Sequence, residues 1–122
     1  MYANPLPLLT GIQVTGWTSK QNQAMAVGVP AFERLLLLAE TSETGQARRV
    51  ASFLAACYNA TAFPWDPSDL RAVDISISTD MLICLDAVRW GQADLHTRVP
   101  RGAGRLPRLI KARGMRWPNE IG

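Results

Sequence analysis

Residues 45–60 read GQARRVASFLAACYNA, and their spacing indicates the fold class. Their larger apolar side chains recur at the spacing of one face of an α-helix, and they are Val50, Phe53, Leu54, Cys57 and Tyr58. The adjacent arginines differ, because Arg48 points away from this stripe whereas Arg49 lies at its edge, where its aliphatic stem can cover apolar surface. We therefore expect Arg49 to pair with an aspartate of the turn at residues 66–74, and Arg48 to face solvent or a partner.

Helical spacing continues on both sides of this stretch. Upstream, a helix starts near Pro30, because proline suits the first helical position. Downstream, Asp66 can cap a short helix that Pro67 opens. A longer helix then begins after Asp74 and ends at Gly91, a natural helix stop. The inward face of this longer helix is predicted to comprise Val73, Ile77, Met81, Cys84, Leu85 and Val88.

The N-terminal residues 1–28 differ from this helical middle. Lys20 is their only charged side chain, and five prolines and glycines interrupt any helix there. We therefore expect a nonhelical N-terminal arm, with a short strand at GIQVTGW (residues 11–17) as an alternative.

The C-terminal part is predicted to contain one loop and one short helix. Pro100, Gly102 and Gly104 indicate the loop. Pro107 can open the helix, and Gly114 can end it. The side chains expected to face inward are Leu106, Leu109 and Ile110.

These elements predict an all-α fold, a small single-domain bundle of four to five helices. The expected parts are an N-terminal arm (1–28), a helical core (29–95) and a basic C-terminal segment that packs on the core (96–122). Apolar residues make up 48% of the 122 residues, which suffices for one modest core. The longest apolar run, residues 35–39, is far shorter than the roughly 20 residues of a membrane span. Without a recognisable secretory signal, we expect a cytoplasmic protein with no membrane partner.

Charge is unevenly distributed along the chain. The net charge is +3, yet residues 1–95 carry six basic and nine acidic side chains, whereas residues 96–122 carry seven basic ones and Glu120 alone. Such a segment can neutralise nucleic-acid phosphates, meet an acidic protein surface or neutralise the body of its own chain. The candidate macromolecule-binding residues are therefore Arg98, Arg101, Arg105, Arg108, Lys111, Arg113 and Arg116, together with Arg48.

The chain offers few groups for catalysis. His96 is the only histidine, and we expect a surface or helix-capping role for it. Cys57 and Cys84 fall at apolar helix positions, where buried and inert thiols are expected, and two thiols with one histidine do not complete a four-ligand zinc site. We expect no catalytic, metal or cofactor-binding residues, and hence no enzyme. The alternative is a site assembled in space from distant residues.

Three stretches of the sequence resemble a family of short bacterial proteins of unknown function from proteobacterial plasmids and integrative elements. They are GQARRVASFLAACYNA, DPSDLRAVD and STDML, so the resemblance spans about residues 31–90. The chain departs from the family at residues 56–58, where the family tends to carry bulkier aromatics, and at Arg71, where it tends to carry tryptophan. The resemblance implies no catalytic residues. It implies cargo of mobile DNA, a class that includes anti-CRISPR and other anti-defence proteins, transfer accessories and small regulators.

These observations lead to one main functional hypothesis and its alternatives. The main hypothesis is a non-enzymatic accessory protein of mobile genetic elements that binds a macromolecular partner, such as a host defence complex that it inhibits. The alternative is a nucleic-acid-binding regulator or transfer accessory that uses the arginine-rich C-terminal segment. A homodimer is a further use for leftover apolar surface, at residues 35–38 or on the N-terminal arm.

Overall fold

The computed structural model describes residues 11–118, with side chains placed from residue 16 onward. Within that range the chain forms four α-helices and two short 3-10 helices, with no β-strand among them. They are α1 (Gly11–Thr41), α2 (Gly45–Tyr58), η2 (Pro67–Arg71), α3 (Ile75–Trp90), η3 (Leu95–Thr97) and α4 (Gly102–Ala112). The expected all-α fold class is confirmed. None of the described helices combines the length and the apolar character that a membrane crossing requires.

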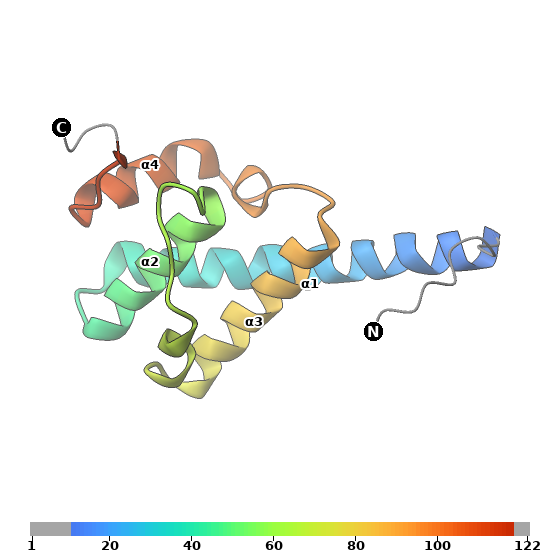
Figure 1. The fold of residues 1–122 in the computed structure, drawn as a ribbon, viewed down its shortest axis with the longest axis horizontal. Coiled ribbons are helices and arrows are strands. Elements are labelled where there is room, and N and C mark those ends of the chain that lie inside the picture. The colour runs from blue at the N-terminus through green and yellow to red at the C-terminus, as the bar shows by residue number, and fades with distance from the viewer. Residues whose placement is uncertain (1–10, 119–122) are drawn as a thin grey trace.

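Helix α1 starts earlier than the sequence predicts. Residues 11–28 are helical, not a nonhelical arm or a strand, and residues 1–10 of the expected arm lie outside the described residues. Pro30 lies inside the helix, where it removes one N–H donor. The first residues of α1 extend past the other helices (Figure 1).

Tertiary contacts support the helix ahead of Pro30. Ala24 and Met25 are buried, and the Gln21 side-chain amide donates a 3.1 Å hydrogen bond to the carbonyl oxygen of Trp90 in α3. These contacts offset the local cost of the glycines and the proline, which is about 1 kcal/mol for a glycine and about 3 kcal/mol for an interior proline. Local propensity alone predicted the opposite outcome.

Helices α1 and α3 cross at a pair of small residues. A Cβ atom at Gly28 would lie 2.6 Å from the Cβ of Ala87, so the two backbones are closer here than a side chain on α1 would allow. The thiol of Cys84 lies beside the same point, with its sulfur 3.9 Å from the carbonyl oxygen of Gly28. Gly28 is therefore a packing residue and not a helix breaker.

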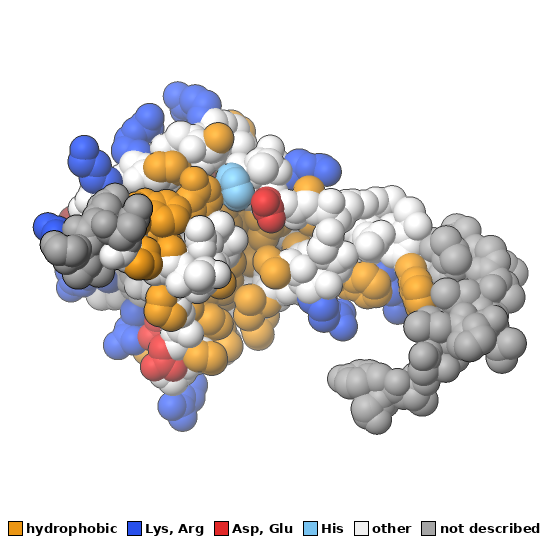
Figure 2. Space-filling view, turned by 45° about the horizontal axis from the view of Figure 1, so that its top comes forward, with side chains coloured by type: hydrophobic (Ala, Val, Ile, Leu, Met, Phe, Trp, Pro, Cys, Tyr) orange, Lys and Arg blue, Asp and Glu red, His pale blue; other side chains and the backbone are white. Residues whose placement is uncertain are grey.

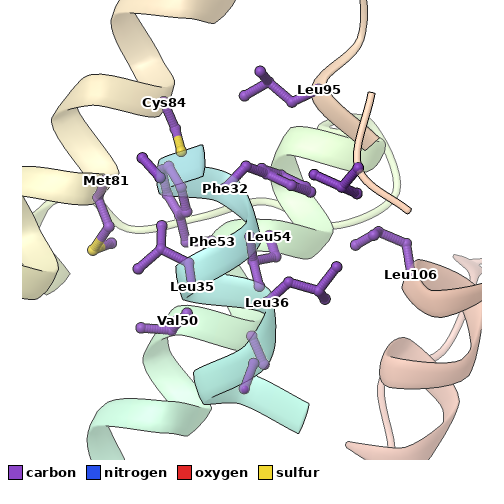
Figure 3. Close-up of a cluster of buried hydrophobic side chains, with 14 of the residues drawn as sticks. Phe32, Leu35, Leu36, Val50, Phe53, Leu54, Met81, Cys84, Leu95 and Leu106 are labelled. Atoms are coloured by element: carbon purple, nitrogen blue, oxygen red, sulfur yellow. The ribbon is translucent and has the colours of Figure 1, made fainter. Parts of the chain in front are cut away.

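The hydrophobic core lies where all four helices meet (Figure 3). Its central side chains are less than 5% exposed and come from α1 (Phe32, Leu35, Leu36), α2 (Val50, Phe53, Leu54), α3 (Met81, Cys84), η3 (Leu95) and α4 (Leu106). Burying each large side chain contributes about 1.5–3 kcal/mol. Most of the predicted stripe on α2 is thus in the core, and its last two members, Cys57 and Tyr58, pack at the margin.

The predicted cap of η2 and the predicted limits of α3 are confirmed. The Thr44 hydroxyl caps α2 by accepting a 3.2 Å bond from the Ala47 N–H, and the Asp66 carboxylate caps η2 in the same way. Helix α3 starts after Asp74 and ends at Gly91, which is left-handed with φ +64°. Val88 was predicted to face inward on α3, but its side chain is 49% exposed.

Helix α4 begins at Gly102 and not at Pro107, so the predicted loop glycines are helical. A Cβ atom at Gly102 would lie 1.9 Å from the carbonyl oxygen of His96, so this glycine allows a close approach of η3 and α4. The three predicted inward side chains are buried, and Gly114 follows the helix with φ +73°.

Two glycines of α1 give a matched test of the helix crossing. We expect Gly28→Ala to lower the free energy of unfolding by about 1–3 kcal/mol, because its methyl group overpacks against Ala87. Gly16→Ala should raise it by about 0.5–1 kcal/mol, because Gly16 has open space around it and alanine favours the helix. Urea unfolding followed by circular dichroism measures both.

The double variant Gly28→Ala, Ala87→Gly is the control for this test, and it should recover part of the lost stability. Equal stabilisation by both alanines would contradict the close crossing.

Candidate macromolecule-binding surface

The seven cations of the C-terminal segment divide into two groups. Arg105 and Arg113 are held inside the fold by partners on or just after α1. The other five are exposed, and their side chains have no hydrogen bond or ion pair with another residue of the range 11–118. These five, the cationic surface, are Arg98, Arg101, Arg108, Lys111 and Arg116.

Arg105 joins α4 to α1. Its guanidinium donates to both carboxylate oxygens of Glu33 and of Glu40, at 2.7–3.2 Å, and to the carbonyl oxygen of Pro100. The side chain is only 8% exposed. Hydrogen bonds to Glu40 and Glu33 raise the pKa of Arg105 above its already high ordinary value, so the group is a permanent cation. Arg105 therefore has a structural role.

Arg113 binds the C-terminal end of α1. One nitrogen of its guanidinium donates to the carbonyl oxygens of Ala39 and Ser42, which belong to the end of the helix and the residue after it. A second nitrogen lies 3.7 Å from the carboxylate of Glu43. Because the last carbonyls of a helix lack intrahelical partners, this contact satisfies them and fixes the α1–α2 corner.

Arginines of the body pair with three of the six remaining carboxylates of the described range. Arg49 pairs with Asp69, which confirms the predicted link from α2 to the turn at 66–74. Arg34 forms a bidentate pair with Asp80, at 2.8 Å. Two nitrogens of Arg89 donate to one carboxylate oxygen of Asp86, the shorter bond at 2.6 Å. Asp66, Asp74 and Asp94 are the carboxylates of the described range that have no arginine partner.

The cationic surface follows the outward side of α4. Arg108 and Lys111 lie three residues apart on α4, and Arg101 immediately precedes the helix with φ +56°. Arg98 follows η3, and Arg116 lies beyond Gly114. Figure 2 shows Lys and Arg side chains projecting from the upper edge of the molecule, with hydrophobic side chains gathered beside them.

Arg48 lies on the side of α2 that is turned toward α4. It precedes Ala55 by two helical turns, and Ala55 packs with Ile110 of α4. The side chain is exposed and has no partner in the described range, as predicted. Arg48 is therefore a further exposed cation, carried by α2.

Two hollows flank α4. The first, of about 240 Å³, has mixed charge because Glu40 and Glu43 line it together with Arg105, Arg108 and Arg113. The second, of about 600 Å³, lies at the end of the helix and has only cations among its charged lining residues. Its lining is Pro107, Ile110, Lys111, Gly114, Met115, Arg116 and Trp117.

A row of aromatic rings adjoins the second hollow. Trp117 packs edge-to-face against Phe63, with ring centroids 4.8 Å apart, and against Tyr58 at 6.2 Å. Tyr58 also contacts His96 at 4.8 Å. Sequence reasoning placed Tyr58 in the apolar stripe of α2, and it missed this row because its members are far apart in sequence.

The two thiols lie in apolar surroundings. Burial raises the pKa of Cys57 to about 12 and raises the pKa of Cys84 still further. Both groups are therefore protonated near neutral pH and are weak nucleophiles. Within the described residues, no three side chains of His, Cys, Asp or Glu are grouped so that they could hold a metal ion.

A family model described as a family of unknown function (DUF7673) matches residues 29–114. The protein belongs to this family. The DUF7673 match begins inside α1, ahead of Pro30, and ends at Gly114, so it contains four members of the cationic surface. A search of the curated proteins and a search of the solved structures each found no match. The expectation of a family without an assigned function is confirmed.

Removing the Arg105 guanidinium should destabilise the fold more than removing a surface arginine. We expect Arg105→Met to lower the free energy of unfolding by about 2–4 kcal/mol, because it leaves two partly buried carboxylates close together without a cation. Arg34→Met, at a more exposed pair, should cost about 1 kcal/mol or less. Chemical unfolding measures both variants, and equal losses would show that the Arg105 pairs are ordinary surface ion pairs.

The thiols give a second test, by alkylation. In the folded protein at about pH 8, Cys57 should react slowly with iodoacetamide, because a pKa of about 12 leaves roughly one thiolate in ten thousand. The rate should rise as the pH approaches that pKa, since the thiolate is the reacting form. Mass spectrometry follows the reaction, and the urea-unfolded protein is the control. Equal rates in the folded and unfolded protein would show that Cys57 is not shielded.

Proposed function

We propose that this protein binds a nucleic acid through the cationic surface and carries out no chemistry of its own. The observation that carries the proposal is the division of the basic side chains. The arginines that have carboxylate partners hold the fold together, while Arg98, Arg101, Arg108, Lys111 and Arg116 stand exposed along and beside α4 without partners in the described range.

Charge on this surface suits a phosphate backbone. Each exposed cation that contacts a phosphate releases condensed counterions, which favours binding at low salt. Four of the five members are arginines, whose planar guanidinium can donate two parallel hydrogen bonds to one phosphate. Arg48 adds a sixth cation from α2.

The proposed biological setting is a mobile genetic element of proteobacteria, as the resemblance of the central segment implies. In that setting the protein would be a cytoplasmic regulator or a transfer accessory that acts on DNA or RNA. The raised thiol pKa values and the intramolecular use of most carboxylates support a binding role rather than a catalytic one.

A second candidate is an inhibitor that binds a protein of a host defence complex. The observation that favours it is the first hollow, where Glu40 and Glu43 line the surface beside Arg108. Such mixed charge suits a protein partner that carries both signs, and a nucleic acid would be repelled by the carboxylates. Recovery of a defence complex from a host lysate, lost in Glu43→Arg, would support this candidate.

Salt-dependent binding tests the main proposal. A labelled oligonucleotide should bind at low salt, and the slope of log affinity against log salt should lie near −3.5 to −4.5 if all five cations neutralise a phosphate. Arg101→Gln with Arg108→Gln should make the slope shallower by about 1.4 to 1.8, since each removes one phosphate contact. Fluorescence anisotropy measures both quantities.

Arg71→Gln is the matched control for this test. Arg71 is also exposed, lies in η2 on the α3 side of the body, and should leave affinity and slope unchanged. Absence of binding to DNA and RNA at low salt would overturn the proposal.

A further inference from the structure

The second hollow combines features that the rest of the cationic surface lacks. Lys111 and Arg116 are the charged residues of its lining, and Trp117 forms part of its wall. The remaining lining is mostly apolar and includes Ile110 and Met115. Across α4, the first hollow contains carboxylates and no aromatic ring. An anionic group with an attached flat ring is therefore favoured in the second hollow.

The ring of Trp117 is held in a fixed orientation. Its edge-to-face contacts with Phe63 and Tyr58 restrict it from two sides, while the side chain keeps partial exposure. A held ring loses little conformational entropy when a ligand stacks on it. The row continues through Tyr58 to His96, so partly exposed rings run on from the hollow toward η3.

Cations beside an aromatic ring are the elements of single-strand recognition. Every nucleobase has a flat face that stacks on an aromatic side chain, and basic groups alongside follow the phosphates. In a duplex the base faces are covered by neighbouring bases, so only the phosphates meet such a surface.

We propose that the second hollow binds an unpaired nucleotide of a single-stranded nucleic acid, with its base against Trp117 and its adjacent phosphates at Lys111 and Arg116. This inference rests on the proposed nucleic-acid binding and names the form of nucleic acid that the surface prefers. The duplex uses the cations alone, whereas the single strand uses the cations and the ring.

The experiment compares a fluorescein-labelled oligothymidylate of about 16 nucleotides with a duplex of the same length. Anisotropy is recorded for the wild type, Trp117→Leu and Trp17→Leu. Trp117→Leu should weaken single-strand binding roughly 5- to 150-fold, the value of one stacked base, and leave duplex binding unchanged. Trp17→Leu is the matched control, because Trp17 is 43% exposed on the extended part of α1, and it should change neither affinity.

A second variant covers the case in which Trp117→Leu disturbs packing against Phe63 and Tyr58. Lys111→Gln with Arg116→Gln removes no aromatic contact, and circular dichroism confirms that the fold is retained. This variant should lower single-strand affinity by a larger factor than duplex affinity, because the two cations flank the base site. Arg98→Gln with Arg101→Gln, at the other end of α4, should lower both affinities by similar factors.

The outcomes separate the two proposals. If the wild type binds neither oligonucleotide at low salt, the proposed function fails and this inference fails with it. If both oligonucleotides bind with equal affinity, or if the variants at the second hollow weaken both equally, the inference is overturned while nucleic-acid binding stands. If the variants at the second hollow lose affinity for the single strand alone, the inference is supported.

Discussion

The guanidinium of Arg105 is the contact on which the arrangement of this protein depends. It holds α4 against α1 through two carboxylates that lie two helical turns apart, and it is nearly buried. A buried cation is stable only with partners, so Glu33 and Glu40 have to face α4. The same contact fixes how α4 is turned on the body, with Arg108 and Lys111 left exposed on that helix. One arginine of the basic segment thereby orients the others, and it also uses two of the carboxylates that would otherwise neutralise them.

Local patterns predicted the central elements because the determinants are local there. The stripe from Val50 to Tyr58, the caps at Asp66 and the stop at Gly91 each involve residues within one or two helical turns. The same reasoning failed at Gly28 and Gly102, which it treated as helix breakers. Gly28 lies inside α1 and Gly102 is the first residue of α4, and a Cβ atom at either would collide with another helix. Local propensity does not contain that information, since the colliding atoms belong to residues far along the chain or on another helix.

The candidate surface was predictable in composition and not in detail. Charge asymmetry pointed to the segment from Arg98 to Arg116, and helical spacing separated Arg48 from Arg49, whose partner Asp69 lies on the predicted turn. The sequence held no sign that Arg105 and Arg113 differ from their neighbours, because their partners lie 65–74 residues away. The row of aromatic rings could not be predicted for the same reason, since His96, Tyr58 and Trp117 come from three separate segments. Contacts between distant segments decide which of several equivalent side chains stay available for a partner.

The early residues of α1 have a mechanical consequence. From Gly11 to Lys20 the helix spans about 15 Å, beyond the point where Gln21 fastens it to α3. A continuous helix transmits orientation, whereas a coil of the same length does not. Anything joined to this end would be carried at a set distance and direction from α4. The direction in which the helix leaves the body is set by its crossing with α3 at Gly28 and Ala87.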